Sequence, residues 1–269
     1  MQTSLFDYPF PKELAAQHPL PQRDESRMMV LSRGRDSWEH RKFYDLPDYL
    51  QQGDLLVVNN AEADWVEQEG RLVPPLPPYI KRKKATDFTE EDFQRYKTVY
   101  ASVAGSKAAP TAGFHFTPEI LEKIRTQGVE IREVTLHVSY DTYKPIRSEQ
   151  IEEHPMHGET YTIPEETAEA VLRAKKEKRR IIAVGTTTVR VLESWALSQR
   201  KEETTKLFIS PGFKFQVVDA LVTNFHRPKS TVLVMVSAFV GRELVMKAYE
   251  EAIREKYRLF SYGDCMLII

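Results

Sequence analysis

The chain contains one cysteine, Cys265, among 269 residues. A single thiol cannot form an intramolecular disulfide, nor can it supply the several thiolates of a cysteine-rich zinc site. This sparse use of cysteine is typical of a reducing compartment, so we expect a cytoplasmic location.

Long apolar runs and a leader are also lacking. The longest apolar stretch, near Val232 to Val240, is too short to span a bilayer. Residues Met1 to Asp7 do not combine a basic start with an apolar run, so they do not resemble a signal peptide. We therefore expect no association with a membrane.

The formal net charge is only −1, so the chain as a whole is not a polycation. Any contact with nucleic acid must come from local basic patches. Two stretches qualify, Lys81 to Lys84 and Lys175 to Arg180. The second ends a predicted helix, where basic residues also complement the helix dipole, so a solvated helix end is the competing interpretation.

The 11 glycines form none of the common nucleotide-binding or nucleophile motifs, neither a G-x-G-x-x-G, nor a P-loop, nor a serine elbow. A standard dinucleotide site and the usual glycine-rich methyltransferase site therefore have no support. Hydrophobic residues make up 41% of the chain, which suffices for a sizeable core without disulfides or metal.

Apolar runs and amphipathic stretches alternate along the chain, which predicts an α/β fold with a mixed sheet and flanking helices. Strands are predicted at residues 28–32, 53–60, 134–138, 181–184, 217–222 and 231–239, and helices at 117–128, 164–176, 186–196 and 242–256, with an acidic helical stretch ending near residue 96. We expect residues 1–60 and 75–269 to form one α/β catalytic domain, joined by a short connector at 61–74.

The segment Gly185-Thr186-Thr187-Thr188 lies between a predicted buried strand and a helix. Backbone N–H groups at a helix start favour an anion, and Arg190 adds a positive charge nearby. The alternative is a threonine-capped helix after a tight glycine turn.

The segment Ala109 to Phe116 is rich in small residues, including Thr111 and Gly113, and carries His115. Small residues let a flat ligand approach the backbone, and a histidine can transfer protons near neutral pH. A packed loop with a hydrogen-bonded histidine is the competing interpretation.

Polar residues follow or face three further predicted elements. His137 and Thr135 share the polar face of one strand, and Asn224-Phe225-His226 follows another at a corner suited to holding a nucleobase. Near the end of the chain, Asp264 supplies a carboxylate. The alternative for His137 is a half-buried histidine in a strand, and for Asn224 it is a turn that begins at the asparagine. The alternative for Asp264 is a surface turn.

His154 and His157 have a spacing found in metal sites. Pro155 disfavours a helix there, and the single cysteine lies far away in the chain, so we predict no metal site.

Taken together, a dozen collinear segments resemble the queuosine ribosyltransferase-isomerase family. They are residues 21–27, 53–59, 75–80, 96–100, 108–116, 135–138, 183–190, 211–213, 218–226, 230–231, 237–239 and 257–264.

The resemblance implies an enzyme that uses S-adenosylmethionine as a ribosyl donor and needs no further cofactor. The acceptor would be 7-aminomethyl-7-deazaguanine at the wobble position of a tRNA, and the products epoxyqueuosine, adenine and methionine. Within the matching motifs we expect His115, His137 and His226 to transfer protons or contact the base, and the threonines 186–188 with Arg190 to bind anionic or polar groups. The remaining substrate-binding candidates are Thr111, Gly113, Thr135, Gly185, Phe225, Asn224 and Asp264. A monomer is expected.

The chain departs from the family pattern in two places. The small inserted β-barrel that usually follows the strand ending at Asn59 is absent from this sequence, and Asn60-Ala61-Glu62 replaces the usual Asp-Thr-Arg. Ser139 and Asp141 replace two glycines, which predicts a bulkier, charged pocket wall. Two alternatives therefore stay open: a paralogue that uses S-adenosylmethionine on another acceptor, and a non-catalytic RNA-binding relative.

Overall fold

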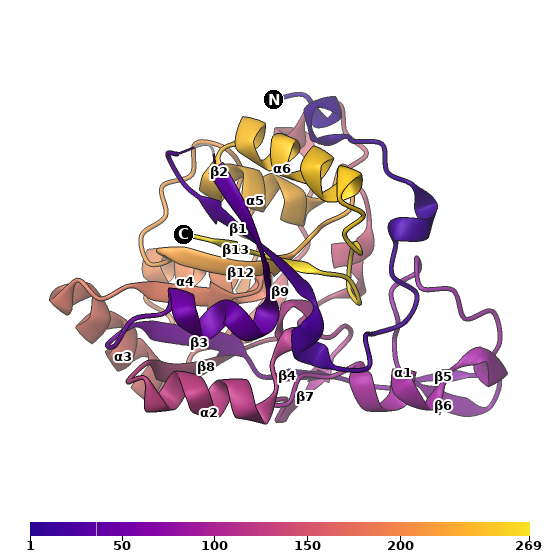
Figure 1. Ribbon diagram of the computed structural model, residues 1–269, viewed down its shortest axis with the longest axis horizontal. Helices are drawn as coiled ribbons and strands as arrows, with labels where there is room; N and C mark the ends of the chain where they lie inside the picture. The colour runs from indigo at the N-terminus through magenta and orange to yellow at the C-terminus, as the bar shows by residue number, and fades with distance from the viewer. Residues whose placement is uncertain (36) are drawn as a thin grey trace.

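A large mixed sheet forms the centre of the computed structural model, which describes residues 1–35 and 37–269 (Figure 1). Within these residues its nine strands lie in the order β11-β9-β8-β3-β10-β12-β13-β1-β2. The strands are β1 (Arg27–Ser32), β2 (Ser37–Lys42), β3 (Leu55–Asn59), β8 (Glu130–Leu136), β9 (Glu159–Thr162), β10 (Ile181–Val184), β11 (Glu202–Thr205), β12 (Ala220–Asn224) and β13 (Cys265–Ile268). The predicted fold class, an α/β protein with a mixed sheet, is confirmed.

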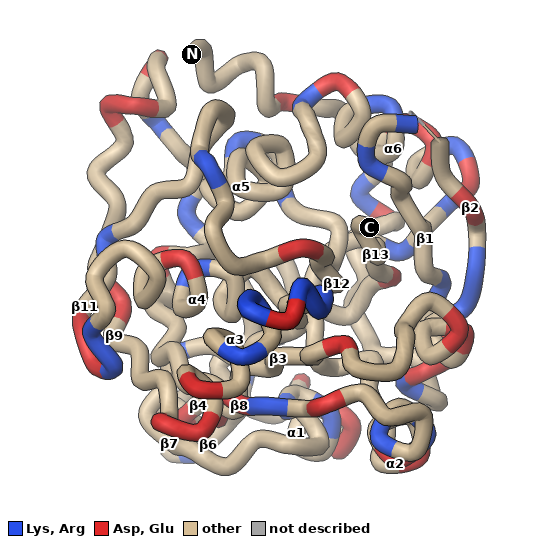
Figure 2. The backbone as a smooth tube through the Cα atoms, turned by 90° about the vertical axis from the view of Figure 1, so that its left-hand side faces the viewer, with Lys and Arg blue, Asp and Glu red and all other residues tan. Residues whose placement is uncertain are grey.

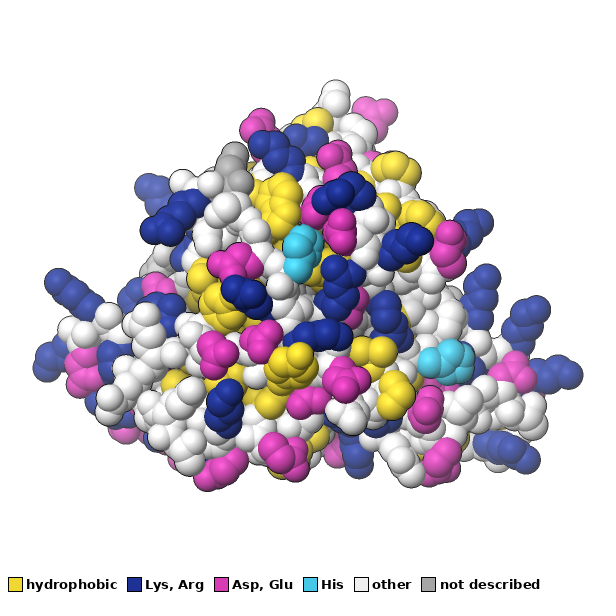
Figure 3. Space-filling model, in the orientation of Figure 1, with side chains coloured by type: hydrophobic (Ala, Val, Ile, Leu, Met, Phe, Trp, Pro, Cys, Tyr) yellow, Lys and Arg dark blue, Asp and Glu magenta, His cyan; other side chains and the backbone are white. Residues whose placement is uncertain are grey.

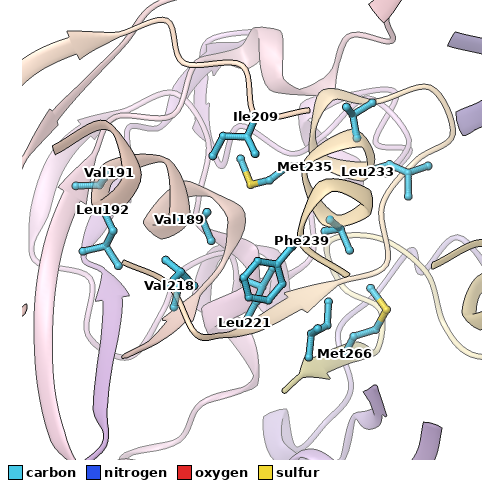
Figure 4. Close-up of a cluster of buried hydrophobic side chains, with 14 of the residues drawn as sticks. Val189, Val191, Leu192, Ile209, Val218, Leu221, Leu233, Met235, Phe239 and Met266 are labelled. Carbon is cyan, nitrogen blue, oxygen red and sulfur yellow. The ribbon is translucent and has the colours of Figure 1, made fainter. Parts of the chain in front are cut away.

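Helices cover both faces of this sheet because its inner strands are apolar on both sides. Leu55 and Val57 of β3 belong to the core under the helices α3 to α6, whereas Leu56 and Val58 belong to the core under α2 and η4. The helices are α1 (Glu90–Arg95), α2 (Pro118–Thr126), α3 (Glu165–Glu177), α4 (Thr186–Ser198), α5 (Thr231–Val240) and α6 (Arg242–Arg254). Figure 4 shows the larger core where α4 and α5 pack on the sheet.

Short 3₁₀ helices connect several of these elements. They are η1 (Thr3–Phe6), η2 (Lys12–Leu14), η3 (Arg23–Glu25), η4 (Phe43–Tyr49), η5 (Ala85–Asp87), η6 (Thr111–His115), η7 (Tyr140–Tyr143) and η8 (Ile151–Glu153).

The central strands β3, β10 and β12 run parallel, so their carboxyl ends meet at one edge of the sheet. Helix α4 begins directly after β10, and Asn224 ends β12. In open α/β sheets ligands bind outside the carboxyl ends of such strands. The fold thus brings two of the predicted polar segments to the same edge.

Two strand predictions are wrong. Residues 231–239 form helix α5, in which the Ser230 hydroxyl accepts a hydrogen bond from the Leu233 N–H. An apolar run that is buried all round has no periodicity to separate helix from strand. The strand predicted at 217–222 begins only at Ala220, because the N–H groups of Val217 and Val218 donate to the Glu193 carboxylate instead of a neighbouring strand.

The segment predicted as a connector carries strands of its own. Strand β4 (Ala61–Ala63) pairs with β7 (Val103–Ser106). Strands β5 (Val66–Gln68) and β6 (Arg71–Val73) form a hairpin, which lies at the right of Figure 1. Glu69 and Gly70 both have positive φ, as the two central residues of a tight hairpin turn require. The division of the chain into domains stays a prediction.

Among the described residues, no helix combines the length and the apolar character needed to cross a bilayer.

Candidate active site

A cavity lies where β10 and β12 end. Its polar lining residues include Thr111, Thr186, Thr187, Thr223, Asn224, His226, Arg227 and Ser261. The rings of Tyr79, Tyr143 and Phe260 also line it. Such a mixed lining of apolar, aromatic and a few polar residues is typical of small-molecule sites.

The start of helix α4 forms a polar wall. Gly185 has a φ of +88°, a conformation that glycine adopts without strain. The first N–H groups of a helix have no partner within it, and the helix dipole there favours negative charge. The Thr187 hydroxyl is buried without a hydrogen-bond partner among the described residues, so it is available to a ligand. Thr188 instead donates its hydroxyl to the Val184 carbonyl at 2.6 Å and serves the helix.

Asn224 presents a fixed carboxamide oxygen. Its Nδ2 donates to the Phe260 carbonyl at 2.9 Å, which orients the group, while Oδ1 is buried with no partner in the described chain. Phe225 supports this corner from the core, with its ring centroid 5.2 Å from that of Tyr249. The Asn224 side chain also interacts with His115, where it opposes the lowering of the histidine pKa by burial, so the carboxamide faces both the cavity and His115.

His226 lies at the cavity with its ring held in place. Nε2 is 2.8 Å from the Thr223 hydroxyl, and the backbone N–H donates to the Tyr249 hydroxyl at 2.8 Å. Burial lowers the pKa of His226 to about 3, so the imidazole is neutral at physiological pH. A neutral imidazole is the form that accepts a proton.

Arg227 is the residue that the sequence interpretation missed. Its Nη1 donates to the Tyr143 carbonyl at 3.0 Å, and its guanidinium lies 5.6 Å from the Tyr79 ring centroid. It is the one arginine or lysine that lines the cavity, and no carboxylate of the described residues lies within 4.0 Å of it. Its place directly after Asn224-Phe225-His226 was the available signal.

Arg190, by contrast, already has an acidic partner within the chain. It forms a buried ion pair with Glu159, with the two side chains 6% and 2% exposed, and it also donates to the Thr205 carbonyl. Arg190 does not line the cavity. Together with Thr186, Thr187 and Glu159 it lines a separate small cavity. That Arg190 binds an anionic ligand group stays a prediction, which the ion pair with Glu159 of β9 disfavours.

The three predicted histidines do not share one cavity. His115 is buried in a neighbouring recess, with Nδ1 2.7 Å from the Ser26 hydroxyl and a pKa lowered to about 3, mainly by burial. Its Nε2 has no hydrogen-bond partner within the described chain. His137 packs against Gly105, where an added Cβ would lie 3.2 Å from its ring. Only His226 lines the main cavity.

The other candidates divide in the same way. Thr111 lines the cavity, but a Cβ on Gly113 would lie 2.0 Å from the Tyr100 hydroxyl, so that glycine is needed for packing. Thr135 donates its hydroxyl to Asn60 at 2.6 Å. Asp264 accepts the backbone N–H groups of Arg27 and Arg258, each at 2.8 Å, and so clamps two chain segments together.

The predicted charged wall at Asp141 is also wrong. Its carboxylate pairs with Lys144 at 2.6 Å and does not line the cavity, although the next two residues do.

The basic stretch at the end of α3 precedes β10, so it lies at the amino ends of the parallel strands, opposite the cavity. Figure 2 shows its basic residues around α3. Arg179 pairs with Glu130 and Arg180 with Asp54. At the other stretch, Arg82 pairs with the buried Asp92. Both arrangements fit structural roles.

The described residues contain no group of three or more His, Cys, Asp or Glu side chains that could hold a metal ion. His157, one of the two spaced histidines, contacts Glu159 at 3.2 Å.

The family described as "Queuosine biosynthesis protein" matches residues 3–65 and 62–268, almost the whole chain. The chain belongs to this family. Among its relatives are proteins named S-adenosylmethionine:tRNA ribosyltransferase-isomerase from Carboxydothermus hydrogenoformans, 43% identical, and Syntrophotalea carbinolica, 41% identical, with all of each chain covered. The crystal structure of an S-adenosylmethionine tRNA ribosyltransferase from Thermotoga maritima matches this queuosine biosynthesis protein with a TM-score of 0.71 and 36% identity, over 99% of this chain and 100% of that one.

The alignment with a relative is longer than this chain. The alignment with the Syntrophotalea carbinolica relative runs over 349 positions, whereas this chain has 269 residues. At least 80 aligned positions therefore have no counterpart here. The family matches the chain in two segments that meet at residues 62–65, at the end of β4, which is where the sequence pattern lacks the inserted domain.

Proposed function

We propose that the cavity at the carboxyl ends of β10 and β12 binds S-adenosylmethionine and directs its ribose toward a modified tRNA base. The activity itself, S-adenosylmethionine:tRNA ribosyltransferase-isomerase in queuosine biosynthesis, follows from the family and from relatives about 40% identical over their full length. The expected function is thereby confirmed. The wobble position, the monomeric state and the cytoplasmic location stay predictions.

The observation that carries the cavity assignment is that polar groups and aromatic rings line the same cavity. The methionine end of the donor carries a carboxylate, which the start of α4 and the guanidinium of Arg227 would bind. The adenine ring is flat and apolar on its faces, and Tyr79, Tyr143 and Phe260 offer faces on which it would stack.

We assign the binding site of the acceptor base to Asn224 and His226, at the end of β12. The aminomethyl group of the base must lose a proton when it is joined to the ribose, and the neutral imidazole of His226 is placed to accept a hydrogen bond or a proton from it. The carboxamide of Asn224, which lines the cavity and also interacts with His115, would hold an N–H or O–H group of either substrate.

Adenine release tests the proposed function. The purified protein is incubated with S-adenosylmethionine, with and without tRNA that carries 7-aminomethyl-7-deazaguanine, and adenine is measured by chromatography. We expect adenine only when both substrates are present. Release with unmodified tRNA at the same rate would support a different acceptor, and no release under any condition would support a non-catalytic role.

A further inference from the structure

Three arginines from distant parts of the chain surround a second recess beside the proposed active site. Arg23 lies in η3, Arg95 ends α1, and Arg258 follows α6. The recess has a volume of about 290 Å³, and His115, Ser261 and Tyr262 also line it. Ser261 lines the main cavity as well, and it is 2.6 Å from the Tyr79 hydroxyl, so the two spaces adjoin.

None of the three guanidinium groups forms an ion pair with a carboxylate of the described residues within 4.0 Å. Each donates instead to one backbone carbonyl: Arg23 to Phe114 at 3.1 Å, Arg95 to Pro21 at 2.9 Å, and Arg258 to His18. These neutral contacts orient the side chains and leave their charges uncompensated.

The recess retains unused donors. Arg95 Nε and Arg258 Nη1 are buried without a hydrogen-bond partner among the described residues. Burial and the nearby charge of Arg95 lower the pKa of Arg23 to about 10, and burial also lowers the pKa values of Arg95 and Arg258. Two carboxylates act on the recess from a distance, Glu91 on Arg95 and Asp264 on Arg258. Asp264 accepts the backbone N–H of Arg258 rather than a donor of its side chain.

We propose that this recess binds a phosphodiester group of the RNA substrate, next to the nucleotide whose base enters the main cavity. Guanidinium groups match the oxygens of a phosphate with paired hydrogen bonds, and three of them can surround one phosphate. A chain of net charge −1 needs such a local site to hold RNA.

The donor carboxylate is the other anion in the reaction, and the main cavity already provides for it. Arg227 and the start of α4 lie there, together with the aromatic wall that a nucleoside needs. The arginine recess offers only Phe114 and Tyr262 as aromatic residues and is much smaller. This inference rests on the proposed function, because it assumes that tRNA is the acceptor substrate.

The test uses the full chain with Arg95→Gln and Arg258→Gln, which keep a side-chain donor for the backbone carbonyl but remove the charge. Arg95→Lys retains the charge, and Arg125→Gln on the exposed face of α2 is the matched control. Binding of the modified tRNA is measured at several salt concentrations, S-adenosylmethionine binding is measured by calorimetry without RNA, and melting curves verify folding.

We expect each glutamine variant to weaken tRNA binding about tenfold, and the slope of log K against log salt to fall by about one. Arg95→Lys should keep the wild-type slope, and donor binding should not change. Unchanged tRNA affinity and slope in folded variants, with wild-type adenine release intact, would overturn the proposal while leaving the proposed function in place. Loss of donor affinity instead would assign the recess to the carboxylate of S-adenosylmethionine, and this result would also overturn the proposal.

Discussion

Arg190 and Glu159 form an ion pair that is buried between α4 and β9. Glu159 also accepts the Ser139 N–H at 2.7 Å and contacts His157, so its carboxylate is well satisfied. The pair links α4, which begins at the cavity, to strand β9. In the sheet, β3 and β8 lie between β9 and β10, the strand that leads into α4. The ion pair of Arg190 thus fixes the position of α4, whose first residues line the cavity.

The buried ion pair predicts how loss of Arg190 changes the free energy of unfolding. Arg190→Met leaves Glu159 buried without its counter-charge, so we expect the free energy of unfolding to fall by about 3–5 kcal/mol in urea titrations. The double variant Glu159→Gln/Arg190→Met should recover much of that loss, because no buried charge is left unpaired. A folded, stable Arg190→Met protein with a strongly raised KM for S-adenosylmethionine would contradict this role and restore Arg190 as a ligand.

Arg227 is predicted to bind the donor carboxylate. Arg227→Ala should weaken binding of S-adenosylhomocysteine by about 10-fold to 100-fold, since a charge-assisted hydrogen bond is worth about 1.5–3 kcal/mol. Methylthioadenosine lacks the carboxylate, so its affinity should be nearly unchanged. Calorimetry with both ligands measures the difference. Equal losses for the two ligands would show that Arg227 acts through the shape of the cavity instead.

His226 is predicted to take part in proton transfer. His226→Gln should lower kcat for adenine release by about 10²-fold to 10⁴-fold, the usual contribution of a positioned base, with a smaller change in donor affinity. His40→Gln, on the exposed side of β2, serves as the control; Figure 3 shows the histidine side chains exposed on one face of the molecule. Wild-type kcat in the His226 variant would remove this residue from the mechanism.

The buried histidines also predict how stability depends on pH. His115 titrates near its ordinary pKa of 6.5 in the unfolded chain and at about 3 in the folded protein. Between these two pKa values only the unfolded chain binds the proton. The contribution of His115 to the free energy of unfolding is therefore complete above pH 6.5 and decreases as the pH drops toward 3. One such group contributes a slope of at most about 1.4 kcal/mol per pH unit.

Denaturant titrations from pH 7 to pH 4 measure this slope. His115→Gln should make it shallower, whatever its effect on stability at pH 7, because one group that protonates on unfolding is gone. An identical slope in the wild type and the variant would show that His115 is not buried in its neutral form.

The alternating pattern of strands and helices sufficed to predict the mixed α/β sheet, because each inner strand is apolar on both faces. It also placed Gly185 to Thr187 and Asn224 to His226 correctly, since both segments directly follow parallel strands. The helical conformation of residues 231–239 was not predictable from an apolar run that is buried on all sides.

Side-chain partners that are remote in sequence limited the prediction of the site. Thr187 and Arg190 lie one helical turn apart, and only the position of Glu159 on β9 decides that the arginine faces a carboxylate rather than the cavity. The recess formed by Arg23, Arg95 and Arg258 likewise depends on three distant segments meeting. No local spacing in the sequence encodes such meetings.

The most direct test of the central claim is a crystal structure of the protein with S-adenosylmethionine bound. We predict the donor in the cavity at the ends of β10 and β12, with its carboxylate at Arg227 and the start of α4 and its adenine against the aromatic wall. A donor bound elsewhere, with this cavity still filled only by water, would contradict the account.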